Sequence, residues 1–386
     1  MKSDWKIVTI NDCADVVGDG LHGTPQYSQN GEYAFVNGNN LINGKVVIKS
    51  DTKRVSFSEF EKYKKELNDR TIFVSINGTL GNVSVYNNEK IILGKSVCFI
   101  NVKNGYDKNF LFYVLSSPTF RNYIETNSTG TTIKNFSLKQ MREYSFSLPD
   151  ICLQKKIAAI LSALDEKIAI NRAINDNLLA QAQMLYKQCF PYGVQDDLPD
   201  GWRIGTVGEI IEIHDSKRIP LSGADRSKME KKIYPYYGAA SLMDLVDNYI
   251  FDGKYLLLGE DGTVVDDAGY PILQYVWGQF WVNNHAHILT GRLGYDVESL
   301  YMLFKQTPVK SIVTGAVQPK ISQANLRSVQ VVIPPEHNLR EYNDLVEPLF
   351  SLFRANEDEC KTFTALRDTL LPKLMSDEID VSAVQL

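Results

Sequence analysis

The stretch TGTTIKNFSLKQMREYSFSLPD, residues 129–150, has the pattern of a turn, a short amphipathic segment and a strand. A second stretch, TGAVQPKISQANLRSVQVVIPP at residues 314–335, aligns with it without a gap, 185 positions later. Thr, Gly, Ser, Arg and Pro residues coincide, and five apolar pairs also match: Phe136 with Ile321, Met141 with Leu326, Tyr144 with Val329, Phe146 with Val331, and Leu148 with Ile333. Such self-similarity predicts that one folding unit is built twice.

The surrounding sequence extends this repeat in both directions. DWKIVTINDCADVV (4–17) and GWRIGTVGEIIEI (201–213) open the two halves with Trp, a basic residue and an alternating run, and DDLPDG marks a loop between the halves. Each half continues with short strands and tight turns and ends in a long helical pattern. The predicted segments are a first domain over 1–150, a first long helix over 151–190, a linker over 191–200, a second domain over 201–335, a second long helix over 336–376, and a tail over 377–386.

The two helical segments carry apolar residues alternately four and three positions apart, which is the seam of a coiled coil. The predicted pairing residues are Ile157, Leu161, Leu164, Ile168, Asn171 and Leu178 in the first helix, and Leu349, Phe353, Asn356, Phe363 and Leu370 in the second. A helix of this length needs a partner, and its own repeat is available. We therefore predict an α+β fold with two homologous mixed α/β domains separated by two long antiparallel coiled-coil helices, in a pseudo-two-fold arrangement.

Asn171 and Asn356 occupy equivalent seam positions in the two helices. A buried Asn in such a seam fixes the register of pairing at some cost in stability. The alternative is that these residues face solvent or a helix of another subunit. The sequence does not distinguish the two.

Composition excludes several classes of protein. Apolar residues make up 44% and charged residues 23% of the chain, as in ordinary globular proteins. No apolar run is long enough for a membrane helix and no signal peptide is recognisable, so a cytoplasmic protein without membrane contact is expected. Five widely spaced cysteines argue against disulfides and zinc. The net charge of −5 means that any nucleic-acid contact must be local.

No arrangement of residues indicates catalysis. A phosphate-binding GxxxxGK[ST] loop and an Asn-Pro-Pro-aromatic methyltransferase motif are both missing from the sequence. His285 and His287 could share a strand face as metal ligands do, but no third ligand is evident. The acidic GEDGTVVDDAG stretch (259–269) is more typical of turns than of a nuclease site. The sequence therefore predicts no catalytic residue, metal or cofactor.

Two related domains at a fixed separation suit recognition of a two-part target in duplex DNA. Because the domains differ in sequence, they would read different half-sites and give an asymmetric target. The helices would act as a ruler across the intervening base pairs. Inserting or deleting about four residues in the helices would then change the gap while leaving both half-sites intact.

Over nearly its whole length the chain resembles the specificity subunit of type I restriction–modification enzymes. The resemblance is carried by Trp5 and Trp202, GDGLHGTPQY (18–27), YYGAASLMDLVDNYIFDGKYLLLGEDGT (236–263), NNHAHIL (283–289), TGAVQPKIS (314–322) and LPDICLQKKIAAILSALDEKI (148–168). It implies two target-recognition domains and two central helices without catalysis of their own. The implied partners are double-stranded DNA and two adenine-N6 methyltransferase subunits, with motor-nuclease subunits joining for restriction.

Residues in Gly-containing loops, where backbone can approach DNA closely, are the predicted contacts. They are His22, Thr24, Lys95, Thr131, Thr132 and Lys134 in the first domain, and Lys217, Arg218, Lys254, Gln318 and Lys320 in the second. Two other functions stay open. A coiled-coil scaffold for proteins would show no salt-dependent DNA affinity, and an autonomous nuclease would cleave DNA with a metal ion.

Overall fold

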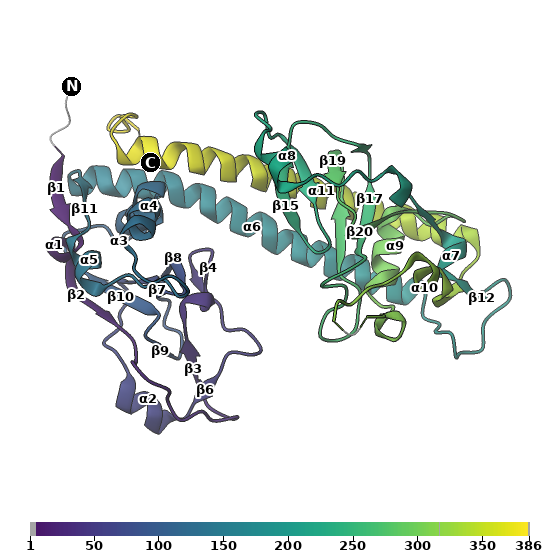
Figure 1. Ribbon diagram of the computed structural model, residues 1–386, viewed down its shortest axis with the longest axis horizontal. Coiled ribbons are helices and arrows are strands. Elements are labelled where there is room, and N and C mark those ends of the chain that lie inside the picture. The colour runs from purple at the N-terminus through teal and green to yellow at the C-terminus, as the bar shows by residue number, and fades with distance from the viewer. Residues whose placement is uncertain (1–4, 316, 385–386) are drawn as a thin grey trace. The chain divides into compact units, whose positions relative to one another are not determined.

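The computed structural model describes residues 5–315 and 317–384, which form two compact units (Figure 1). The first unit contains the described residues up to Ile170 and those from Glu359 onward, and the second runs from Asn171 to Asp358. Each long helix therefore contributes one segment to each unit. Within the described ranges, no helix is long and apolar enough to cross a membrane.

A four-stranded antiparallel sheet forms the centre of the first unit, in the order β2 (Ala14–Asp19), β10 (Val97–Val102), β7 (Thr71–Asn77) and β8 (Thr79–Val85). Alternate side chains of β7 and β10 point to opposite faces, as a strand requires. Ile72 and Ile100 pack with the helices α3 (Lys108–Ser116) and α4 (Pro118–Asn127), whereas Phe73 and Phe99 pack with a smaller sheet. Both central strands are buried almost throughout because both their faces are covered.

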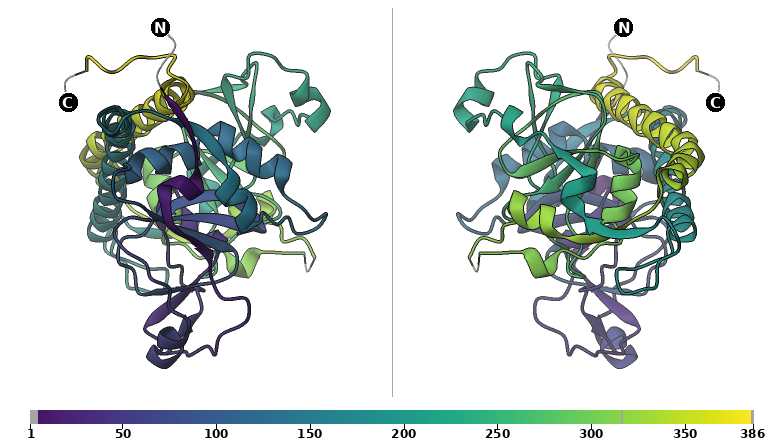
Figure 2. Two further views of the ribbon diagram at one scale, coloured as in Figure 1. Left: turned by 90° about the vertical axis from the view of Figure 1, so that its left-hand side faces the viewer. Right: turned by 90° about the vertical axis from the view of Figure 1, so that its right-hand side faces the viewer.

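The smaller sheet of the first unit has the order β6 (Arg54–Val55), β3 (Tyr33–Val36) and β9 (Ile91–Leu93), with β3 and β9 parallel. Figures 1 and 2 show α2 (Phe57–Tyr63), near this sheet, at the end of the unit farthest from its segment of α6. The other elements are β1 (Lys6–Thr9) paired with β11 (Ser145–Leu148), β4 (Leu41–Ile42) paired with β5 (Lys45–Val46), α1 (Ile10–Cys13), α5 (Leu138–Glu143) and η1 (Gly38–Asn40).

The second unit repeats this topology. Its central sheet has the order β13 (Ile211–Ile213), β20 (Ala286–Gly291), β17 (Tyr255–Gly259) and β18 (Leu273–Val276), and its smaller sheet has the order β15 (Leu242–Val246), β14 (Tyr234–Tyr237), β19 (Gln279–Val282) and β16 (Phe251–Asp252). The parallel pair recurs as β14 and β19. The other elements are β12 (Arg203–Thr206) paired with β21 (Gln330–Ile333), α7 (Val207–Ile210), α8 (Gly223–Ser227), α9 (Val297–Phe304), α10 (Gln323–Ser328), η2 (Asp215–Lys217) and η3 (Lys310–Ile312).

Two long helices, α6 (Ile151–Cys189) and α11 (Glu336–Met375), run antiparallel within each unit. The α6 helix begins after Pro149, where the Asp150 carboxylate accepts hydrogen bonds from the backbone N–H groups of Cys152 and Leu153 at 2.8 and 3.0 Å. In the first unit Ile157 and Leu161 join the core together with Leu371 and Leu374 of α11. These two helices and the repeated domain topology confirm the predicted fold class.

The predicted pairing residues are mostly shielded from solvent. Ile157, Leu161, Ile168, Asn171, Leu178 and Asn356 are buried, and Leu164, Leu349, Phe353, Phe363 and Leu370 are half-buried. The buried α11 residues Tyr342, Val346 and Phe350 pack with Ala182 and Tyr186 of α6 in the core of the second unit.

The two repeated Asn positions lie inward, as the register-fixing alternative required. Asn171 is 1% and Asn356 is 9% exposed. The Asn356 Nδ2 group donates to the Asn175 Oδ1 atom at 2.9 Å, and Asn175 Nδ2 donates to Glu357 Oε1 at 2.9 Å. The polar seam residue of α11 is therefore hydrogen-bonded to α6 inside the second unit.

The stretch repeated at a spacing of 185 residues forms the same hairpin in both units. Thr129 and Asn135 exchange two backbone hydrogen bonds at 2.9 and 2.7 Å, and Thr314 and Lys320 do so at the same two distances. Gly130 has φ +99° and Gly315 has φ +88°, a region that favours glycine. The corner recurs because identical backbone geometry requires glycine at the same position.

We expect Gly130→Ala and Gly315→Ala each to reduce the free energy of unfolding by about 1–3 kcal/mol. The added Cβ would lie 2.3 Å from the carbonyl oxygen of Ile133 or Gln318, and alanine is strained at these φ values. Thermal unfolding of the variants measures the effect. Gly23→Ala is the matched control, because its Cβ would meet nothing within 4 Å. Equal melting temperatures for all three variants would contradict this account of the corner.

Candidate nucleic-acid interface

The hairpin lies beside the turn that follows the central strand in each unit. In the first unit Gly78 N–H donates to Lys134 O at 3.0 Å, and Phe136 N–H donates to Ile76 O at 2.8 Å. In the second unit Gly262 N–H donates to Pro319 O and Ile321 N–H donates to Glu260 O, at the same two distances. We call this edge of each central sheet the hairpin end; it comprises the hairpin, this turn, and the loop after β2 or β13.

Five of the six predicted contacts of the first unit lie at its hairpin end, and the sixth, Lys95, lies beside it. Thr131, Thr132 and Lys134 are exposed on the hairpin tip, and His22 and Thr24 are exposed in the loop after β2. Lys95 is exposed in the turn before β10, and its backbone N–H donates to Leu21 O at 3.0 Å, which joins the turn to that loop. The His22 Nε2 atom lies 2.6 Å from Asp19 Oδ2.

The predicted contacts of the second unit are divided. Lys217 and Gln318 are exposed at the hairpin end. Lys320 lies on the hairpin, with its side chain 50% exposed and its Nζ atom 3.2 Å from Glu260 Oε1. Arg218 and Lys254 are held in ion pairs within the unit.

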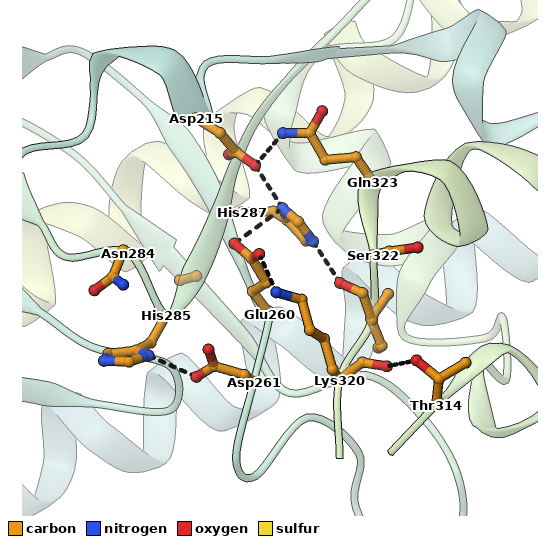
Figure 3. A network of polar contacts seen from close by, with 12 residues as sticks. Asp215, Glu260, Asp261, Asn284, His285, His287, Thr314, Lys320, Ser322 and Gln323 are labelled. Atoms are coloured by element: carbon orange, nitrogen blue, oxygen red, sulfur yellow. Dashed lines mark hydrogen bonds and ion pairs between the residues drawn. The ribbon is translucent and has the colours of Figure 1, made fainter. Parts of the chain in front are cut away.

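A network of buried polar side chains underlies this hairpin end (Figure 3). His287 on β20 is fully buried, with Nδ1 2.6 Å from Asp215 Oδ2 and Nε2 2.8 Å from the Ile321 carbonyl oxygen. Asp215 also accepts from Gln323 Nε2 at 2.6 Å and from Ile288 N–H at 3.0 Å. The network thus ties the loop after β13 to β20, to α10 and to the end of the hairpin.

Arg218 completes this network and is shielded by it. Its Nη1 group donates to Glu260 Oε2 at 2.6 Å and to the Ala286 carbonyl oxygen at 2.8 Å, and its side chain is 13% exposed. The guanidinium of Arg218 therefore neutralises a carboxylate of the same unit. Its side chain is mostly shielded from solvent, although a DNA contact was predicted for it.

Lys254 lies outside the hairpin end. Its Nζ group donates to Glu298 Oε1 at 2.7 Å, and the same oxygen accepts from Tyr275 and from Arg354 of α11, at 2.7 and 3.0 Å. Glu298 is fully buried, and a charge in that position requires a partner. Lys254 Nζ also donates to Glu347 Oε2 of α11 at 3.3 Å, so Lys254 holds the second domain to its segment of α11.

The carboxyl groups of Asp215 and Glu260 are charged at neutral pH. Burial raises the pKa of Asp215, but the hydrogen bond from His287 and its charge outweigh burial, and the pKa is lowered from its ordinary value of 3.8. Burial likewise raises the pKa of Glu260, but the hydrogen bond from Arg218 and the charges of His287 and Arg218 lower it from 4.5.

Asp215, Glu260 and His287 offer ligand atoms within 4.8 Å of one another, a spacing that could hold a metal ion. The side chains do not fit a metal as they stand. Each carboxylate oxygen already faces a donor, from Ile288, Gln323, His287, Arg218 or Lys320, and the His287 Nε2 atom is bonded to a carbonyl. Ion pairing within the protein accounts for the cluster.

The sequence alone did not predict one cluster of Asp215, Glu260, His287 and Gln323. The i, i+2 spacing of His285 and His287 was visible, but their contacts differ. His285 Nδ1 lies 2.6 Å from Asp261 Oδ1 at the surface, whereas His287 points inward. The available signal was an aspartate at a similar point of both repeats: Asp19 is the last residue of β2, and Asp215 comes two residues after β13.

The sequence matches the family described as the type I restriction modification DNA specificity domain, over residues 2–180 and again over 199–354. The chain belongs to this family, which confirms the resemblance seen in its motifs. Specificity subunits of type I enzymes are non-catalytic.

Individual relatives match along nearly the whole chain. The type I restriction enzyme MjaIX specificity subunit of Methanocaldococcus jannaschii is 22% identical over 98% of this chain and 94% of that protein. A putative type I specificity subunit of Mycoplasma genitalium is 23% identical over 97% and 94%. The crystal structure of a type I restriction–modification S subunit from M. genitalium shares the fold, with a TM-score of 0.56 and 21% identity over 99% of this chain and 98% of that one.

Acidification should open the hairpin end of the second unit before that of the first. Because the pKa values of Asp215 and Glu260 are lowered in the folded protein, their charges add stability that is present above their ordinary values of 3.8 and 4.5 and is lost as the pH falls through the folded values. Hydrogen-exchange protection of residues 317–323, compared with residues 131–137, measures this. Equal loss of protection at one pH would show that the buried carboxylates are not responsible.

Proposed function

We propose that this chain is the DNA-recognition subunit of a type I restriction–modification system and that each hairpin end reads one half of an asymmetric two-part target. The main support for this proposal is the hairpin end, which has the same backbone structure in both units but exposes different side chains in each. The tip of the first hairpin exposes Thr131, Thr132, Ile133 and Lys134, whereas the second exposes Val317, Gln318 and Pro319. One frame with two different surfaces supports two different half-sites.

The recognition domains in this proposal are residues 1–150 and 201–335. Exposed lysines at or beside the two hairpin ends (Lys95, Lys134, Lys217 and Lys320) provide charge for phosphate oxygens. The exposed polar groups beside them (His22, Thr24, Thr131, Thr132 and Gln318) provide hydrogen bonds. Arg218 and Lys254 are assigned a positioning role, because their ion pairs already satisfy their charges.

The long helices would bind the partner subunits and set the spacing of the half-sites. Apolar side chains remain exposed on them: Ile170, Ile174 and Met184 on α6, and Leu345, Leu352 and Leu366 on α11. These positions support docking of two adenine-N6 methyltransferase subunits, which would bring the methyl donor. Motor-nuclease subunits would join for restriction and bring ATP. The helices would also set the number of base pairs between the half-sites.

Methylation mapping tests the proposed function. The chain is expressed together with an adenine methyltransferase subunit encoded beside it, and methylated adenines are located by single-molecule sequencing. The expected result is a new asymmetric two-part motif that disappears when the chain is omitted. A soluble complex that yields no chain-dependent motif would favour the scaffold function instead.

A further inference from the structure

We propose that His287 is a positioning residue for the second half-site: its imidazolium clamps the loops of the second hairpin end, so that recognition of this half-site weakens as the pH rises. This inference rests on the proposed function, and it concerns a buried residue that does not touch DNA.

His287 contacts all the segments that form this hairpin end. Its ring lies 2.6 Å from Asp215 in the loop after β13, 3.7 Å from Glu260 at the end of β17, and 2.8 Å from the Ile321 carbonyl at the end of the hairpin. Glu260 in turn pairs with Lys320 of the hairpin. The exposed Lys217 and Gln318 therefore stand on loops whose positions His287 sets.

Both nitrogen atoms of His287 face oxygen atoms. The Ile321 carbonyl oxygen can only accept, so Nε2 must carry a proton to form that hydrogen bond. The Asp215 carboxylate also accepts, so Nδ1 must carry a proton as well. Either neutral tautomer would leave a nitrogen lone pair facing an oxygen and would break one of the two bonds. The clamp is complete only when the ring is doubly protonated.

Charged groups from three segments surround the ring. Asp215 and Arg218 face it from the loop after β13, Glu260 from the end of β17, and Lys320 from the hairpin. Gln323 of α10 adds an uncharged amide that donates to Asp215. Two carboxylates lie within 4 Å of His287 Nδ1, whereas Arg218 and Lys320 point at those same carboxylates.

The first unit does not have this device. Asp19, the last residue of β2, has the place that Asp215 has just after β13, but the residue opposite Asp19 on β10 is Cys98. Cys98 is fully buried, and burial raises the pKa of its thiol, so the thiol stays uncharged. Ile76, whose carbonyl accepts from the hairpin as that of Glu260 does, is apolar. At these positions the first unit has the apolar residues Cys98 and Ile76, whereas the second unit has the ion-pairing residues His287 and Glu260.

The experiment uses the complex of the full chain with its methyltransferase, after the target has been mapped. Methylation rates are measured between about pH 6 and about pH 8.5 on three duplexes: the intact target, one altered in the first half-site, and one altered in the second. For the wild-type protein, the preference for the intact target over the duplex altered in the second half-site should fall as the pH rises.

At the acidic end of the range, the His287→Gln variant should reduce the preference for the intact target over the duplex altered in the second half-site about tenfold, the effect of losing recognition of one base pair. The remaining preference should no longer depend on pH. The preference against the duplex altered in the first half-site should be unchanged. His337→Gln, in an exposed residue of α11, is the matched control and should behave like the wild type.

A second variant, Glu260→Ile with His287→Cys, rebuilds the apolar arrangement of the first unit and keeps the test valid if His287→Gln folds poorly. It should discriminate the second half-site without pH dependence. Persistence of the wild-type pH dependence in either variant, or loss of both half-site preferences together, would overturn the inference. If the wild-type protein itself preferred neither half-site, the proposed function would fail instead.

Discussion

The apolar seam of the two long helices is the constraint on which the rest of the structure depends. Both α6 and α11 bury apolar residues against each other and against the globular part of each unit. In the first unit, Ile157 and Leu161 are continuous with the core of the sheet. In the second, Tyr342 and Phe350 have the same role. Each globular fold is thus completed by a segment from both helices.

Ionic contacts add a specific attachment to this apolar one. In the first unit Asp165 of α6 accepts from Tyr113 of α3 and from Arg367 of α11, both at 2.7 Å. In the second unit the buried Glu298 of α9 accepts from Arg354 of α11. A carboxylate between a domain and an arginine of α11 recurs in both units, although the residues come from different positions. Duplicated units have retained a type of contact while changing the side chains that make it.

The repeat at a spacing of 185 residues was the most informative feature of the sequence. It predicted the two like domains and the two helices because glycine geometry and seam periodicity are local properties of the chain. The buried network was not predicted, because Asp215, Glu260, His287 and Gln323 come together only across the strands of the sheet. For the same reason Arg218 and Lys254 were predicted as surface charges for DNA, whereas their partners Glu260 and Glu298 lie 42 and 44 residues away in the chain. The positive charge of a loop residue is visible in the sequence, but the carboxylate that forms an ion pair with it is not.

The central claim is that one recognition domain with its exit helix was built twice, once for each half-site, and that the helices fix the gap. The most direct test inserts four residues into both helices, after Ile170 in α6 and after Asp358 in α11, where the two compact units divide. Methylation mapping of this variant should return the same two half-sites with a longer gap between them, because about 6 Å of helix has been added. Altered half-sites with an unchanged gap would contradict the account.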